Sequence, residues 1–83
     1  MYRILTEDKN RRDIYNILNS LHIEGFTCIK GTGSWHGVRE NCLAIDLVDV
    51  PIEEVLMVAR AIKEWNKQES VLVLEIQSTS TFV

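Results

Sequence analysis

Hydrophobic residues recur every three to four positions in two segments of the chain, the spacing that places them on one side of an α-helix. The two apolar stripes are Ile14, Ile17, Leu18 and Leu21, and Val55, Val58, Ile62 and Trp65. Asn10 is the expected N-cap of the first helix, and Pro51 fits the first turn of the second. The pattern therefore predicts two amphipathic helices, each with one buried face.

Four other segments are short, apolar and rich in residues that favour β-strands. They span residues 2–6, 26–30, 43–48 and 71–76, and a polar, glycine-bearing connection over residues 31–41 joins the second to the third. The order of elements is thus βαββαβ. With right-handed crossovers, this order predicts an α+β ferredoxin-like fold, in which a four-stranded antiparallel sheet carries both helices on one face.

The last predicted strand is apolar on both sides, because residues 71–74 do not alternate with polar ones. A sheet with helices on one face and water on the other should alternate. Leu5 and Val48 add further apolar groups to the face that should be wet. Scattered surface residues would explain this. We favour packing of other copies of the chain against the open face, because so small a domain buries little surface alone.

Length and composition exclude several function classes. With 83 residues, 46% hydrophobic and 25% charged, the chain forms one globular domain over residues 1–83. A net charge of −3 disfavours nucleic acid and anionic membranes as partners. No apolar run reaches the length of a membrane span, and the first residues lack the apolar core of a signal peptide. We expect a cytoplasmic protein.

The candidate chemistry is concentrated in residues 30–40, where three glycines fall within seven positions. Glycines allow backbone N–H groups to converge on an anion, and a tryptophan offers a flat face to a planar group. The candidate ligand-binding residues are Lys30, Gly31, Thr32, Gly33, Trp35, His36, Gly37 and Arg39. They would suit a ligand that has both a phosphate or carboxylate and a planar ring. A flexible hairpin connection is the structural alternative.

A metal site is a weaker hypothesis for the same region. Cys28, His36, Glu40 and Cys42 are competent ligand types, but their spacing lacks the paired steps that define a tetrahedral site. Cysteines in strands more often act as small buried apolar residues. No set of nucleophile, base and orienting residue is recognisable. We therefore expect a binding protein without a cofactor and not an enzyme.

Residues 23–33 (IEGFTCIKGTG) resemble the segment of PII signal proteins in which a strand opening of glycine, hydrophobic residue and threonine runs into Lys-Gly-x-Gly before the T-loop. Trp35, Gly37 and Glu40 resemble the aromatic-x-Gly-x-x-Glu element of the PII-like and CutA branches. The resemblance implies a ferredoxin-like homotrimer with ligand clefts between subunits, and it points to the same eight candidate residues. The chain departs from PII proteins in having a shorter connection than a T-loop and no glycine-rich basic loop over residues 66–70.

These observations predict a non-enzymatic small-molecule-binding protein of the PII-like type. Its ligand would be a nucleotide or nucleotide-like anion, bound in clefts between subunits for signalling or for sequestering the ligand. One alternative is a CutA-like protein for divalent-metal binding and tolerance. Another is an ACT-like amino-acid sensor, although that fold would place a glycine-bearing turn after the first strand, and residues 7–10 contain no glycine.

Overall fold

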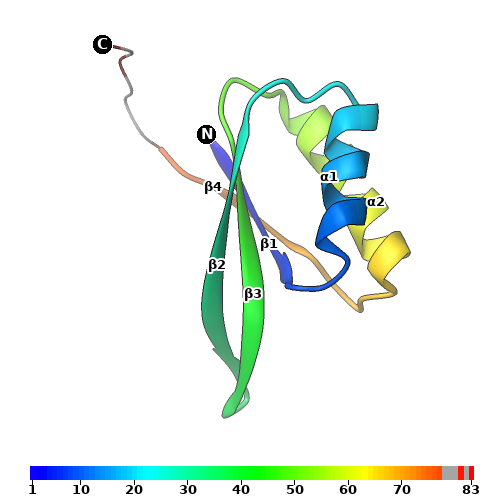
Figure 1. The fold of residues 1–83 in the computed structure, drawn as a ribbon. Coiled ribbons are helices and arrows are strands. Elements are labelled where there is room, and N and C mark those ends of the chain that lie inside the picture. Colours follow the sequence, from blue (N-terminus) through cyan, green and yellow to red (C-terminus); the bar gives the residue numbers. More distant parts are fainter. Residues whose placement is uncertain (78–80, 82) are drawn as a thin grey trace.

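The computed structural model describes residues 1–77, 81 and 83. Its elements are β1 (Tyr2–Glu7), α1 (Arg11–Ser20), β2 (Phe26–Trp35), β3 (Val38–Leu47), α2 (Ile52–Asn66) and β4 (Leu72–Glu75). The strands form one antiparallel sheet in the order β2-β3-β1-β4. Both helices lie on the same side of this sheet (Figure 1). The predicted ferredoxin-like βαββαβ fold is confirmed.

β2 and β3 form a longer hairpin than the sequence predicted. They pair without interruption from Phe26 opposite Leu47 to Trp35 opposite Val38. His36 and Gly37 alone make the turn, with φ angles of 51° and 78°. Positive φ at both positions is the geometry of a type I′ turn, whose twist matches that of the two strands. The prediction that the strands end at residues 30 and 43, with a polar connection over residues 31–41 between them, was therefore wrong, because cross-strand pairing outweighs the weak strand preference of the glycines.

The hydrophobic core lies between the helices and the sheet. Along β3, Leu43, Ile45 and Leu47 are buried against the helices, while Ala44 and Asp46 point to the other face, as the pleat requires. The buried apolar residues are Ile4, Ile14, Leu18, Ile23, Leu43, Ile45, Leu47, Val55, Val58, Ala59 and Ile62. Within the described ranges, no helix is long and apolar enough to cross a membrane.

Trp65 does not belong to this core, contrary to the predicted stripe. Its side chain is 60% exposed, whereas the next residue, Asn66, is only 3% exposed. Asn66 follows Ile62 by four positions and so lies on the same side of α2, one turn further along. The predicted stripe failed at its last position because a buried polar residue, not an aromatic one, faces the interior there.

A polar network accommodates Asn66. Its Oδ1 accepts a hydrogen bond from Asn10 Nδ2 at 2.9 Å, and its Nδ2 donates to Gln68 Oε1 at 2.8 Å. The Thr6 hydroxyl also donates to Gln68 Oε1, at 2.7 Å. Asn10 is the N-cap residue of α1, as predicted, but it adopts a left-handed conformation and its side chain makes no capping hydrogen bond. The network instead joins the β1–α1 turn to the α2–β4 connection.

Replacing Asn66 with leucine is expected to lower the free energy of unfolding by about 1–3 kcal/mol, because the part-buried hydrogen bonds to Asn10 and Gln68 are lost. Urea denaturation measures the loss. The control is Asn19→Leu on the exposed side of α1, where the change should stay within about 0.5 kcal/mol. Equal losses in the two variants would contradict a stabilising role for the network.

The sheet face opposite the helices carries an apolar row across all four strands. Direct pairing places Leu72 beside Leu5, Leu5 beside Ala44, and Ala44 beside Ile29. In the adjacent row, Arg3 and Asp46 form a two-pronged ion pair with an Nε to Oδ1 distance of 2.6 Å. The predicted apolar character of both sides of the last strand is present. Arg3 and Asp46 neutralise each other, so this pair does not prevent the central part of the face from packing.

Candidate ligand site at the base of the hairpin

A hollow of about 270 Å³ lies where the β2–β3 hairpin leaves the body of the domain. Its lining residues are Asp8, Lys30, Gly31, Thr32 and Asn41. Thr32 and Asn41 are direct partners in the hairpin. The backbone N–H of Asp8 donates to the carbonyl oxygen of Asn41 at 3.2 Å. Three segments, the end of β1 and the two hairpin strands, therefore meet at this hollow.

The electrostatics of the hollow are set by an ion pair beside it. Nη2 of Arg11 lies 2.9 Å from one carboxylate oxygen of Asp8 and 3.0 Å from the other. These bonds raise the pKa of Arg11 further above its ordinary value. With Asp8 neutralised in this way, Lys30 is the lining cation that has no ion-pair partner among the described residues. The buried Nε–H of Arg11 also has no hydrogen-bond acceptor within that part of the chain.

Next to the hollow, α1 packs on β2 through aromatic and sulfur contacts. The rings of Tyr15 and Phe26 are 5.9 Å apart, inclined by 36°. Burial raises the pKa of the Cys28 thiol, although a hydrogen bond with Tyr15 and the charge of Arg11 oppose the shift. Cys28 therefore carries a neutral thiol at neutral pH. Cys28 belongs to the contact between α1 and β2.

The structure brings together only some of the predicted ligand residues. Lys30, Gly31 and Thr32 line the hollow. The others follow the hairpin outward, and its turn at His36 is four strand positions beyond Thr32, or roughly 13 Å. The predicted residues that lie along this outer part are Gly33, Trp35, His36, Gly37 and Arg39. The side chain of Trp35 lies outside the described part of the structure. Within one chain, the eight residues thus do not form a single site.

Two lining residues, Asp8 and Asn41, were not predicted. Asp8 was part of a polar connection with no assigned role. Asn41 was placed at the far end of the polar connection over residues 31–41. A signal for Asn41 does exist in the sequence, because a two-residue turn at His36 and Gly37 pairs residue 41 with residue 32. No comparable local signal marks Asp8, which reaches the hollow only through the pairing of β1 with β3.

The four residues of the metal hypothesis do not meet within one chain. Cys28 pairs with the inward-facing Ile45, so it lies on the helix side of the sheet, whereas Cys42 lies on the open side. His36 is at the tip of the hairpin. Among the described residues, no three His, Cys, Asp or Glu side chains are grouped to hold a metal ion. The geometry therefore gives no support to the CutA-like alternative.

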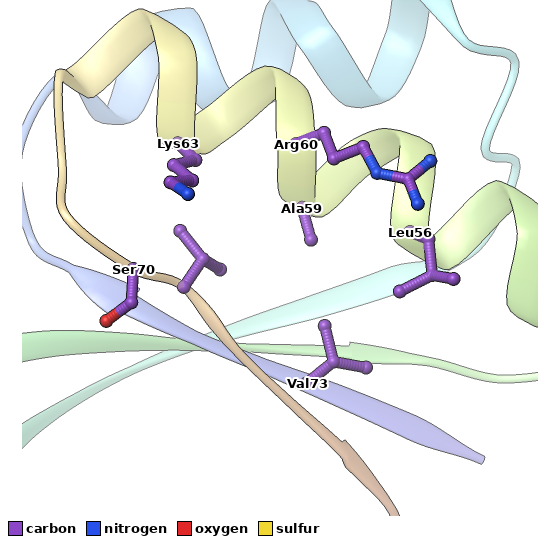
Figure 2. A pocket seen from close by; sticks show the side chains of 7 residues that line it. Leu56, Ala59, Arg60, Lys63, Ser70 and Val73 are labelled. Atoms are coloured by element: carbon purple, nitrogen blue, oxygen red, sulfur yellow. The ribbon is translucent and has the colours of Figure 1, made fainter.

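A second hollow lies between α2 and β4 (Figure 2). It measures about 190 Å³ and is lined by Leu56, Ala59, Arg60, Lys63, Ser70, Val71 and Val73. Its floor is apolar and its cationic groups are on α2. None of these residues was a predicted site residue, because each looks in the sequence like an ordinary helix or strand position. This groove is separate from the hollow at the base of the hairpin.

The chain shares its fold, with this sheet order and both helices on one side, with solved PII-like proteins. One similar structure is CPII from Thiomonas intermedia K12, a nitrogen regulatory PII-like protein bound to ADP, AMP and bicarbonate. It has a TM-score of 0.65 and 19% identity, over 98% of this chain and 92% of that chain. Another is a DUF3240 family protein from Shewanella baltica OS155, with a TM-score of 0.72 and 14% identity, over 99% and 93% of the two chains.

A third similar structure is the GlnK–ATP complex of B. subtilis, with a TM-score of 0.60 and 22% identity, over 90% of this chain and 78% of that chain. No protein-family model and no curated protein matches the sequence. At these levels of identity, the similarity establishes the fold. The resemblance to PII-like proteins is confirmed at that level.

Proposed function

We propose that the chain is a non-enzymatic small-molecule-binding protein. It holds a nucleotide or nucleotide-like anion at the base of the hairpin, in clefts between the subunits of a homotrimer. The observation that carries the proposal is the hollow at the base of the hairpin, where Lys30, which has no ion-pair partner among the described residues, lies with the Thr32 hydroxyl and the Asn41 amide. The nucleotide-bound PII-like proteins of the same fold support the choice of ligand class.

The lining groups suit a ligand with mixed chemistry. The ammonium of Lys30 is the partner for a phosphate or carboxylate. The Asp8 carboxylate is already paired with Arg11, so it does not repel an anion as a free carboxylate would. The Thr32 hydroxyl and the Asn41 amide can both donate and accept hydrogen bonds, as ribose hydroxyls and base edges require. A nucleoside phosphate satisfies all of these groups together.

A single chain supplies only part of such a site. Its hollow of about 270 Å³ falls below the roughly 300–1,000 Å³ of typical ligand pockets. In the proposed homotrimer a neighbouring copy supplies the missing wall. Lys30, Thr32 and Asn41 lie on the helix side of the hairpin, so that wall approaches the hollow from this side and not across the open sheet face. The two-residue hairpin turn provides no long loop for contacting a partner, which favours sequestration of the ligand over signalling.

Calorimetric titration with ADP and AMP tests the proposal. Lys30→Gln is expected to weaken binding by roughly tenfold to a hundredfold, because one charge-assisted hydrogen bond to phosphate is lost. The matched control is Lys67→Gln, another exposed lysine, at the end of α2, which should bind like the wild type. Absence of binding to the wild-type protein, or an unchanged affinity in Lys30→Gln, would contradict the proposal.

A further inference from the structure

The polar groups of the hollow at the base of the hairpin are spread over three strands on the helix side of the sheet. Asp8, directly after β1, donates its backbone N–H to Asn41 of β3, and Asn41 pairs with Thr32 of β2. Lys30 lies two positions before Thr32, so its side chain points to the same face. Asp8 and Lys30 therefore flank β3 on opposite sides. Two strand spacings, or roughly 10 Å, separate the backbones of β1 and β2.

The two flanking groups have opposite hydrogen-bond chemistry. The ammonium of Lys30 can only donate, and the carboxylate of Asp8 can only accept. Nη2 of Arg11 donates to both carboxylate oxygens, at 2.9 Å and 3.0 Å. A carboxylate has about four lone-pair positions, so it can accept further bonds from an occupant of the hollow. The hollow thus suits a molecule with an anionic group at one end and hydroxyl donors at the other.

We infer that Asp8 accepts hydrogen bonds from the ribose hydroxyls of the ligand, so that the hollow selects ribonucleotides over 2′-deoxyribonucleotides. The inference rests on the proposed function, in which Lys30 binds the phosphate. A hollow of about 270 Å³ holds the ribose and its phosphate. The base then extends toward the wall that a neighbouring copy supplies in the proposed homotrimer. Carboxylates recognise ribose hydroxyls in the same way in dinucleotide-binding folds.

The spacing of the two groups disfavours other ligands. A free phosphate carries no group for Asp8, and the charged groups of an amino acid are borne on neighbouring carbon atoms, too close together to reach both Asp8 and Lys30. A guanine base also offers donors to a carboxylate. Its edge is the part of a nucleotide most remote from the phosphate, however, and a hollow of this volume does not reach so far. The ribose is the donor group nearest to the phosphate.

Arg11 is a positioning residue for Asp8. Its Nε atom is buried, although its side chain as a whole is 37% exposed, and the side chain of Asp8 is only 14% exposed. The guanidinium therefore reaches from α1 to a carboxylate that it holds in one orientation. It also cancels the negative charge of Asp8 near the phosphate. Without Arg11, the carboxylate would be free to rotate and would repel the ligand.

Calorimetric titration with ADP and 2′-deoxy-ADP tests this inference. The wild-type protein is expected to bind ADP roughly tenfold to a hundredfold more tightly, because 2′-deoxy-ADP lacks one hydrogen bond to a charged group. Asp8→Ala should abolish the preference. Arg11→Gln should reduce it, and Arg11→Lys should restore part of it, because an ammonium group can still pair with Asp8. Arg12→Gln, at an exposed position of α1, should keep the wild-type preference.

The ratio of the two affinities is measured on the same sample, so a variant that is partly unfolded still reports it. Equal affinities in the wild type, or an unchanged ratio in Asp8→Ala, would overturn the inference and leave nucleotide binding intact. A preference for GDP over ADP that Asp8→Ala removes would also overturn it, because Asp8 would then contact the base. If the wild type binds neither nucleotide, the proposed function fails, and the inference fails with it.

Discussion

Replacing Leu72 with lysine is expected to convert the proposed homotrimer into folded monomers. Leu72 is 53% exposed in the single chain and ends the apolar row of the open sheet face. Packing of another copy on this face would force an unpaired ammonium group out of water, which costs several kcal/mol. Light scattering measures the molecular mass, and far-ultraviolet circular dichroism verifies that each chain remains folded.

Met57→Lys is the control for this experiment. Met57 is 50% exposed, almost the same as Leu72, but it is on α2 on the helix side of the sheet. The same change there should leave the assembly intact. An unchanged mass in Leu72→Lys, or equal dissociation in the two variants, would show that the open face is not the surface through which copies associate.

Replacing Ile62 with alanine is expected to destabilise the domain far more than replacing Trp65, although tryptophan is the larger residue. Ile62 is fully buried, and Trp65 is 60% exposed. A buried Ile→Ala change costs about 2–5 kcal/mol, because apolar contacts are lost and a cavity remains. That is a large share of the roughly 5–15 kcal/mol by which domains are stable. The exposed tryptophan should contribute within about 1 kcal/mol.

Thermal and urea denaturation of Ile62→Ala and Trp65→Ala compare the two losses. Both positions are on α2. The helix propensity of the introduced alanine is therefore common to both variants, and the difference in stability loss reflects the difference in burial. A larger loss for Trp65→Ala would mean that Trp65 is buried in the protein in solution. It would then support the stripe predicted from the spacing of apolar residues.

Periodicity was enough to predict the fold but not the ends of its elements. The apolar residues of α1, α2 and the inner strands are regularly spaced. This spacing can be recognised from a short stretch of sequence without knowing how distant segments pair. Trp65 illustrates the limit. It has the spacing of a core residue, but the buried position is taken by Asn66, whose partner Asn10 is 56 residues away in the chain. Pairings over such a distance have no local pattern.

The candidate site also combines residues that a local sequence motif predicted with residues that only the pairing of distant segments brings in. Lys30, Gly31 and Thr32 were predicted because glycine beside a cation is a local motif. The remaining predicted residues were assigned to a loop, since glycine and serine have weak strand preference. In the structure, their pairing with β3 extends them into an arm that leads away from the hollow. Asp8 joins the site through sheet topology, which depends on how distant segments pair.

Native mass spectrometry of the purified protein in the presence of ADP measures the number of copies and the bound ligand together. A trimer that retains ADP, and that loses it when Lys30 is replaced by glutamine, is the result expected if sister chains close the hollow at the base of the hairpin. A monomer that carries no nucleotide at any ADP concentration would contradict both the assembly and the binding site.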